Sequence, residues 1–348
     1  MTFLETELRR RKIPFLKSKR RIRCFPHIVN LTCQAVLGVI TDMDFAAPEA
    51  ADFVPRPADA APTFMDTVRR DPVATVRTTV RVIRASSLRR QYFSDILKAL
   101  QQKDLQLLRD VNTRWSSTLL MIDRAVLLRE VRFSPACNFS FTVTFTGDRQ
   151  VPFRPPFRDL HKYKLRDNDW DALKAFQRIL AVPHAFQQKL SAEKTPTLGH
   201  ALPAFEAMIS AWQKQQLSHP ETADIVQKGI DKLESYRDRV KEVPVYILSM
   251  LINPAVKLRW FEKHWPERVQ EIKDLFLHEL RPYRTNLTNT PARASQNSWA
   301  DEVLGMDTPD RPTHSQNLAD EVQSYFTEAS YHLGSVRYWE ESQLRYPT

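Results

Sequence analysis

Residues 105–129 read LQLLRDVNTRWSSTLLMIDRAVLLR, and they combine a short apolar segment with a helical pattern. Residues 105–111 are short, apolar and bounded by polar residues, a pattern that predicts a β-strand. In residues 115–129, Trp115, Leu119, Ile122 and Val126 fall on one stripe, which predicts an amphipathic helix. The chain on both sides of this stretch is mostly helical in its pattern.

Helix-start signals and helical spacing extend through most of the remaining sequence. Asp71 followed by Pro72 predicts a helix start, because Asp caps free N–H groups and Pro fits the first helical position. Asp167 or Asn168 predicts the start of a helix that is interrupted near Pro183. Further helices are expected before Pro14, at 24–39, after Ser87, and at 198–216, 221–241, 245–252, 256–263, 266–280 and 318–326.

Three stretches break the helical pattern. Residues 42–66 are acidic and rich in Ala and Pro, which predicts a disordered loop. Residues 285–317 are polar and rich in Pro, Ser, Asn and Thr, which predicts a linker. Residues 138–146 alternate apolar and polar side chains and give the strongest strand signal. We expect residues 105–111 either to pair with that strand or to lie against helices.

Composition restricts the class of protein. The 348 residues include 51 Lys and Arg against 41 Asp and Glu, a net charge of +10 that favours an anionic partner. The six glycines lie far apart, which excludes a Gly-rich phosphate loop. Three cysteines cannot form a disulfide scaffold. No apolar run approaches the ~20 residues of a membrane span, and basic residues at 9–12 replace the apolar core of a secretory signal.

Three motifs occur in order: RCFPHIVNL at 23–31, LLRDVNTRWSST at 107–118 and LINPAVKL at 251–258. Together they resemble the hAT superfamily of DNA transposases, with a fungal character. The resemblance covers nearly the whole chain except residues 131–157, although the family usually has Asp where this chain has Asn253. The signature residues in the first and third motifs are Cys24, His27, Asn30, Asn253, Pro254 and Lys257.

The resemblance implies an RNase H-like fold interrupted by a large helical insertion. We therefore predict a mainly α fold class, with an incomplete RNase H-like α/β remnant at 1–130 and an all-helical insertion domain at 158–284. Residues 131–157 form an atypical insertion, and we hypothesise that 131–149 are a retained intron. Residues 285–317 form the linker, and 318–348 begin a C-terminal dimerisation region.

Intact family members hold Mg²⁺ or Mn²⁺ with two Asp and one Glu. The resemblance places all three acids outside this chain. We therefore expect a truncated, catalytically inactive transposase-derived protein without catalytic residue, metal, cofactor or small-molecule substrate, which binds DNA nonspecifically. The alternative is a helical interaction protein that pairs with itself or with full-length transposase, and an active metal-dependent nuclease is a third reading. The expected location is nuclear, otherwise cytoplasmic, and neither secreted nor in a membrane.

Arg114 and Trp115 are the candidate DNA-binding residues. In the family the equivalent pair lies near the active site and handles transposon-end DNA, and an aromatic side chain can stack on an exposed base. The alternative is a core Trp beside a solvated Arg. Cys24 and His27 lack a second pair of metal ligands, so a packed helix is the better interpretation. The basic runs 9–23 and 77–90 could bind phosphates or form solvated faces.

Overall fold

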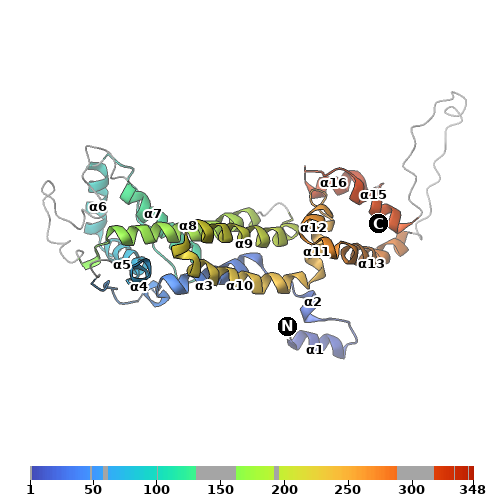
Figure 1. Ribbon diagram of the computed structural model, residues 1–348, viewed down its shortest axis with the longest axis horizontal. Helices are drawn as coiled ribbons and strands as arrows, with labels where there is room; N and C mark the ends of the chain where they lie inside the picture. Colours follow the sequence, from blue (N-terminus) through green and yellow to red (C-terminus); the bar gives the residue numbers. More distant parts are fainter. Residues whose placement is uncertain are drawn as a thin grey trace, which may run out of the picture. The chain divides into compact units, whose positions relative to one another are not determined.

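The computed structural model describes residues 2–47, 49–57, 62–99, 101–130, 162–191, 196–287, 317–332, 334–343 and 345–348 (Figure 1). The chain divides into two compact units, each described here by itself. Unit 1 comprises Met1–Ile22, Ala192–Leu202 and Arg239–Thr348, and unit 2 comprises Arg23–Ser191 and Pro203–Asp238. The domain boundaries predicted at 130, 157 and 317 fall at or beside ranges outside the described residues, so that division stays a prediction.

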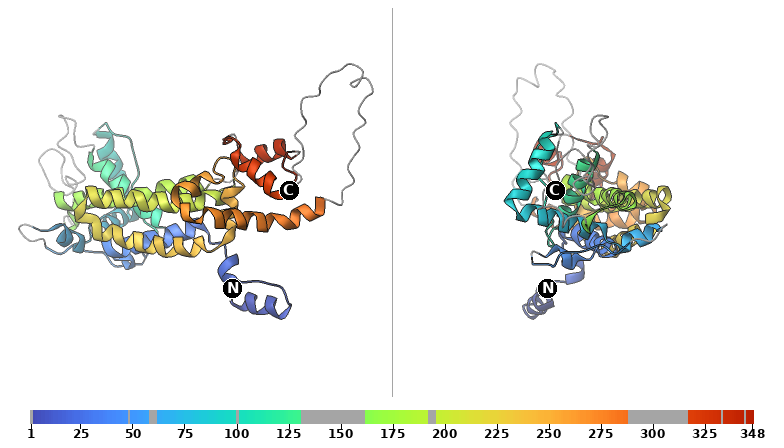
Figure 2. Two further views of the ribbon diagram at one scale, coloured as in Figure 1. Left: turned by 45° about the vertical axis from the view of Figure 1, so that its right-hand side comes forward. Right: turned by 90° about the vertical axis from the view of Figure 1, so that its left-hand side faces the viewer.

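Every regular element in the described part of unit 2 is a helix, and the longest, α8, has 24 residues. This helix packs against α3, α4, α5 and α7. Both views show α8, α9 and α10 side by side (Figure 2). The helices are α3 (Phe25–Ile40), α4 (Phe64–Arg69), α5 (Pro72–Ala85), α6 (Ser87–Ala99), α7 (Trp115–Glu130), α8 (Asp167–Leu190), α9 (Ala201–Ser218) and α10 (Ala223–Lys241), the last two extending into unit 1 at one end.

The start of α5 follows the predicted capping chemistry, whereas α8 begins at Asp167 with Arg166 as its N-cap residue. Asp71 accepts a hydrogen bond of 2.7 Å from the Ala74 N–H, and Pro72 occupies the first position of α5. Thr63 and Asp66 form a reciprocal capping box at the start of α4. These local signals start α4 at Phe64 and α5 at Pro72.

Large buried aromatics fill the core of unit 2. Trp170, Trp212, Phe176 and Phe205 are all less than 2 % exposed. Gly229 of α10 lies against this core, since a Cβ there would come within 2.8 Å of the Trp212 ring and 2.9 Å of the Val36 side chain. A glycine is therefore required where α10 approaches α3 and α9.

Pro183 does not interrupt its helix, contrary to the sequence prediction. Helix α8 continues through Pro183, which is buried, to Leu190. A proline in this position leaves the carbonyl oxygen of Ile179 without its backbone donor. The indole Nε1 of Trp212 donates a 3.0 Å hydrogen bond to that oxygen. A side chain from α9 thus replaces the bond that the proline removes.

The prediction of a strand at residues 105–111 is wrong. These residues form an extended segment without a partner strand, and the described residues as a whole contain no β-strand. The segment lies against helices: Arg84 of α5 donates to the carbonyl oxygen of Leu107, and Arg124 of α7 donates to that of Gln106. Residues 138–146 lie outside the described part. The mainly α prediction is confirmed, whereas the α/β remnant is not shown.

The stretch expected to be a disordered loop at 42–66 carries local structure where it is described. Residues Met43–Ala46 form a 3-10 helix, η1, and Phe45 packs edge-on against Phe53 with 4.9 Å between the ring centroids. Asp52 accepts hydrogen bonds from Arg81 and Tyr163. The acidic side chains therefore have basic and phenolic partners that composition does not reveal.

Unit 1 consists of shorter helices, in which α11 packs against α2, α13 and the 3-10 helix η4 (Leu198–His200). Helix α13 extends through Pro282 to Leu287, three residues into the range predicted as a linker. No helix in the described ranges combines the length and apolar character that crossing a membrane requires. The helices are α1 (Thr2–Arg10), α2 (Lys17–Arg20), α11 (Pro244–Leu251), α12 (Arg259–His264), α13 (Val269–Leu287), α15 (Leu318–Thr327) and α16 (Ser335–Ser342).

Candidate nucleic-acid interface

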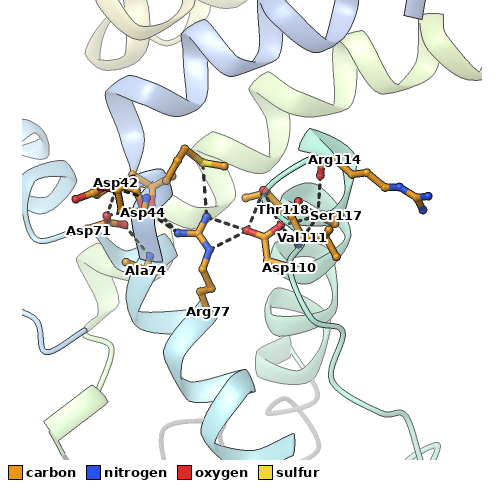
Figure 3. A network of polar contacts seen from close by, with 12 residues as sticks. Asp42, Asp44, Asp71, Ala74, Arg77, Asp110, Val111, Arg114, Ser117 and Thr118 are labelled. Carbon is orange, nitrogen blue, oxygen red and sulfur yellow. Dashed lines mark hydrogen bonds and ion pairs between the residues drawn. The ribbon is translucent and has the colours of Figure 1, made fainter. Parts of the chain in front are cut away.

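The RDVNTRWSST motif folds around the carboxylate of Asp110, whose side chain has no solvent exposure (Figure 3). Ser117 Oγ donates to this carboxylate at 2.6 Å, and Thr118 Oγ1 lies 3.0 Å from both of its oxygens. The backbone N–H of Val111 donates to it as well, at 2.8 Å. Ser117 and Thr118 therefore fasten the start of α7 to the extended segment before it.

Arg77 of α5 is the counterion of Asp110. Its guanidinium lies 2.8 Å from Asp110 Oδ2, and its side chain is only 5 % exposed. Nη1 also donates to Thr41 Oγ1 and to the carbonyl oxygen of Asp42, each at 3.2 Å. Burying a charge is costly unless it is paired and hydrogen-bonded, and Arg77 is both. It therefore links α5 to the end of α3 and to the segment that precedes α7.

Asp71 extends the network beyond Thr41. Its Oδ2 accepts from Thr41 Oγ1 at 3.0 Å and from the Asp42 N–H at 2.8 Å. Burial raises the pKa of the Asp71 carboxyl, although these hydrogen bonds and the charge of Arg77 oppose the shift. Asp71 also has a left-handed backbone with φ 49°, a conformation that Asp tolerates better than most residues. Sequence reasoning found its capping role but not its place in this network.

Arg114 and Trp115, the two predicted DNA-binding residues, have opposite environments. Arg114 is exposed, and Figure 3 shows its side chain pointing away from the network. Its carbonyl oxygen accepts from the backbone N–H of Ser117 at 2.9 Å, which fixes the backbone beneath it. Trp115 is 3 % exposed, and its indole Nε1 donates to Gln187 of α8 at 3.2 Å. Stacking on a base would require the Trp115 ring to leave this position, so Arg114 is the accessible member of the pair.

The first signature motif occupies the start of α3. Cys24 is the exposed N-cap residue, His27 is exposed in the first turn, and Asn30 is partly buried. Cys33 lies in the core, where burial raises the pKa of its thiol. In the described part of the chain, no group of three or more His, Cys, Asp or Glu side chains is arranged to hold a metal ion.

The third signature motif joins α11 and α12 to the C-terminal helices within unit 1. Asn253 Oδ1 accepts from the Ala255 N–H at 3.1 Å and from Ser335 Oγ at 3.3 Å. The carbonyl oxygen of Pro254 accepts from the Tyr331 N–H at 3.1 Å. The sequence marked Asn253 and Pro254 as signature residues without indicating these distant partners.

Lys257 lies at the centre of these contacts with the C-terminal helices, and its side chain has no solvent exposure. Its ammonium donates to the carbonyl oxygens of Tyr325 at 2.8 Å and Glu328 at 3.2 Å, at the C-terminal end of α15. It also lies 4.5 Å from the centroid of the Tyr325 ring. Burial lowers the pKa of this ammonium, although the Glu328 carboxylate opposes the shift. A cation at the last carbonyls of a helix stabilises its end.

The arginines of the basic run at residues 77–90 form hydrogen bonds and ion pairs within unit 2. Besides Arg77, Arg81 binds Asp52 and the carbonyl oxygen of Ala51, and Arg84 binds that of Leu107. Two arginines of α6 also donate to backbone carbonyls. Arg89 donates to the carbonyl oxygen of Val82, and Arg90 donates to that of Arg84. Most of this positive charge therefore supports the fold, which a count of arginines cannot show.

The N-terminal basic run has a different character. Arg10 and Arg11 pair with Glu7, and Lys17 lies 3.8 Å from Glu5. The structure gives the remaining five exposed cations no side-chain partner among the described residues. We call this set the basic arm: Arg9, Lys12, Lys19, Arg20 and Arg21.

Comparison with known proteins supports part of the resemblance seen in the sequence. The chain is 22 % identical over 338 residues to the "Putative transcriptional regulator tpeD" of Talaromyces stipitatus. The aligned part makes up 94 % of this chain. It covers 35 % of that protein, so the chain spans about a third of the length of this curated relative. No solved structure matches the chain.

A family comparison matches residues 22–134 to the ZBED1 RNase-like helical domain. This range includes α3 to α7, together with the Asp110 network and Arg114. The chain therefore carries an RNase-like helical domain, and the network of Figure 3 lies inside it.

Proposed function

We propose that this chain is a transposase-derived helical protein of the hAT type that binds duplex DNA nonspecifically through the basic arm. The observation that carries the proposal is the set of five exposed cations at residues 9–21 for which the described residues supply no side-chain partner. Phosphate neutralisation by Lys and Arg supplies most of the affinity of nonspecific DNA binding. The name of the relative from Talaromyces stipitatus, a transcriptional regulator, supports a nuclear, DNA-associated role.

Arg114 is a second contact in this proposal. It is exposed on a backbone that the Ser117 N–H holds in place, inside the domain matched to the RNase-like helical family. A fixed backbone lowers the entropy lost when a side chain binds its ligand. That the chain has no cleavage activity of its own stays a prediction from the resemblance, and a nicking assay with Mg²⁺ or Mn²⁺ tests it.

The experiment compares two variants that change the net charge equally. The arm variant replaces Arg9, Lys12, Lys19, Arg20 and Arg21 with Glu. The control variant replaces five exposed cations elsewhere with Glu: Arg178, Lys189, Lys214, Lys228 and Lys263. Fluorescence anisotropy with a labelled duplex, measured over a series of salt concentrations, reports affinity and its salt dependence.

We expect the arm variant to lose most of its affinity, whereas the control variant keeps more of it. If all five arm cations contact phosphates, log K for the wild type falls against log[salt] with a slope of about −4.5. Equal weakening in both variants would contradict the proposal, because it would mean that net charge rather than the arm governs binding.

A second candidate function is association with another helical protein, including a full-length hAT transposase. An apolar cavity of about 600 Å³ in unit 1 favours it. Phe276, Tyr325, Trp339 and Tyr346 line this cavity, and Val336 at its edge is 57 % exposed. Sedimentation of the chain alone and with a transposase tests this function, and Val336→Asp should weaken an association that uses the cavity.

A further inference from the structure

A polar cavity of about 340 Å³ lies in unit 2, away from the residues assigned to DNA above. The end of α5, the first turns of α6 and residues 104–107 enclose it. Its polar lining includes two arginines, Arg84 and Arg90, together with Ser87, Gln91 and Ser94. A concave site with a few converging polar groups is the usual form of a small-ligand site.

Arg84 has hydrogen-bonding capacity that the protein does not use. One of its terminal nitrogens, Nη1, donates to the carbonyl oxygen of Leu107 and, at 3.4 Å, to Gln106 Oε1. Its Nε–H is buried without a hydrogen-bond partner among the described residues, and because it is closed to solvent a ligand does not reach it. Its Nη2 donates to no group among the described residues and is not closed off in this way, so it is the donor that an acceptor in the cavity can bind.

Arg90 brings a second guanidinium to the same cavity. Its Nη1 donates to the carbonyl oxygen of Arg84 at 3.2 Å, which places its guanidinium close to the Arg84 backbone. The side chain is exposed, so a ligand can reach its remaining N–H groups from solvent. The hydroxyl of Ser87, in the first turn of α6, adds a neutral donor on the cavity wall.

The one carboxylate in the lining does not cancel this positive charge. Asp104 Oδ2 accepts from Ser94 Oγ at 2.7 Å and lies 3.8 Å from the ammonium of Lys98. The side-chain amide of Gln91 donates to Asp95 at 2.9 Å, so the charge of Asp95 is also engaged. Two arginines therefore face a single carboxylate that already has a cationic neighbour.

We propose that this cavity binds a phosphate group, held by the guanidiniums of Arg84 and Arg90 with the Ser87 hydroxyl as an additional donor. Guanidinium groups match the oxygens of phosphate with paired hydrogen bonds. The proposal does not depend on the basic arm. The phosphate could belong to a nucleic-acid backbone or to a soluble phosphate compound, and the two sources require separate measurements.

The first measurement uses inorganic phosphate on the full chain, by calorimetric titration at constant ionic strength with chloride as the reference anion. The variant is Arg90→Gln, because Arg90 is exposed and its loss leaves the core intact. The matched control is Arg109→Gln, an exposed arginine outside the cavity lining. We expect Arg90→Gln to weaken phosphate binding about tenfold or more and Arg109→Gln to leave it unchanged. An absence of phosphate binding, or equal binding by both variants, would overturn the proposal.

The second measurement identifies the source of the phosphate with a nucleoside monophosphate and with duplex DNA that lacks terminal phosphates. Weaker duplex binding by Arg90→Gln assigns the site to a nucleic-acid backbone. Weaker binding of the monophosphate alone assigns it to a soluble compound, and either result supports the site. The arm variant should bind inorganic phosphate as the wild type does. Failure of the arm proposal and failure of the cavity proposal are therefore distinguishable.

Discussion

The indole Nε1 of Trp212 donates a 3.0 Å hydrogen bond to the carbonyl oxygen of Ile179, four residues before Pro183 in α8. Trp212 belongs to α9, so the continuity of one helix depends on a side chain of another. This relationship leads to a test in which one substitution rescues another.

Trp212→Phe should lower the free energy of unfolding by about 1–3 kcal/mol, because it leaves the Ile179 carbonyl buried without a donor. Adding Pro183→Ala restores a backbone N–H that can reach the same carbonyl, so the double variant should recover part of the loss. Urea unfolding of the four proteins in this cycle measures the coupling. Additive effects of the two substitutions would contradict the proposed exchange of donors.

The helices were predictable from the sequence because their signals are local. Asp71 and Pro72 start α5, and Trp115 starts α7, as predicted. The break expected at Pro183 was wrong because its remedy, Trp212, lies 33 residues from Ile179 along the chain. The strand expected at 105–111 was wrong because a strand exists only with a partner, and here the chain offers arginine side chains instead.

The candidate sites show the same division between local and distant information. The sequence identified Lys257 as a signature residue but could not show that its partner, the Tyr325 carbonyl, lies 68 residues away. It identified the arginines of 77–90 but not that Arg77 pairs with Asp110. Whether a charged residue serves the fold or a ligand depends on burial, which charge counts do not contain.

Lys257→Met should destabilise unit 1 by about 2–4 kcal/mol. The substitution removes the cation that binds the last carbonyls of α15, and the Glu328 carboxylate loses its ion pair with that cation. Lys263→Met, on the exposed side of α12, is the control and should change stability little. Thermal unfolding followed by circular dichroism compares them. Equal melting temperatures would mean that the ammonium contributes no net stability.

Asp110→Asn should destabilise unit 2 by about 3–5 kcal/mol, because the Arg77 charge then stays buried without its counterion. Asp171→Asn makes the same chemical change at an exposed position of α8 and serves as the reference. Hydrogen exchange in α5 and α7 gives the local readout. Unchanged protection of these helices in Asp110→Asn would contradict the role of the network.

Arg114→Gln and Trp115→Ala should separate binding from stability. Arg114→Gln should weaken duplex DNA binding while the melting temperature is unchanged, because the side chain is exposed. Trp115→Ala should cost about 3–5 kcal/mol of stability, since the ring is buried. Leu120→Ala, on the same helix and with the side chain 44 % exposed, is the control for stability. A stable Trp115→Ala protein with impaired DNA binding would instead support stacking by this ring.

The raised pKa of Asp71 predicts a defined pH dependence. The folded protein takes up a proton at the Asp71 carboxyl more readily than the unfolded chain does. The stabilisation from this protonation is therefore fully present below the unfolded pKa of about 3.9, and it is lost as the pH rises through the folded pKa. Asp71→Asn removes the titration. We expect the wild type minus variant difference in unfolding free energy to fall as the pH rises across this window. A rising difference would mean that the hydrogen bonds to the carboxylate outweigh its burial.

The engagement of Arg77, Arg81 and Arg84 by the fold has a consequence for how this chain evolves. Arg77 donates at once to a carboxylate, a hydroxyl and a backbone carbonyl through a planar guanidinium, whose fixed spread of N–H groups the compact ammonium of Lys does not reproduce. Selection for folding alone therefore retains these cations. A descendant that had lost every contact with nucleic acid would keep these arginines, whereas the exposed cations of the basic arm, like those elsewhere on the surface, would be free to drift toward neutrality.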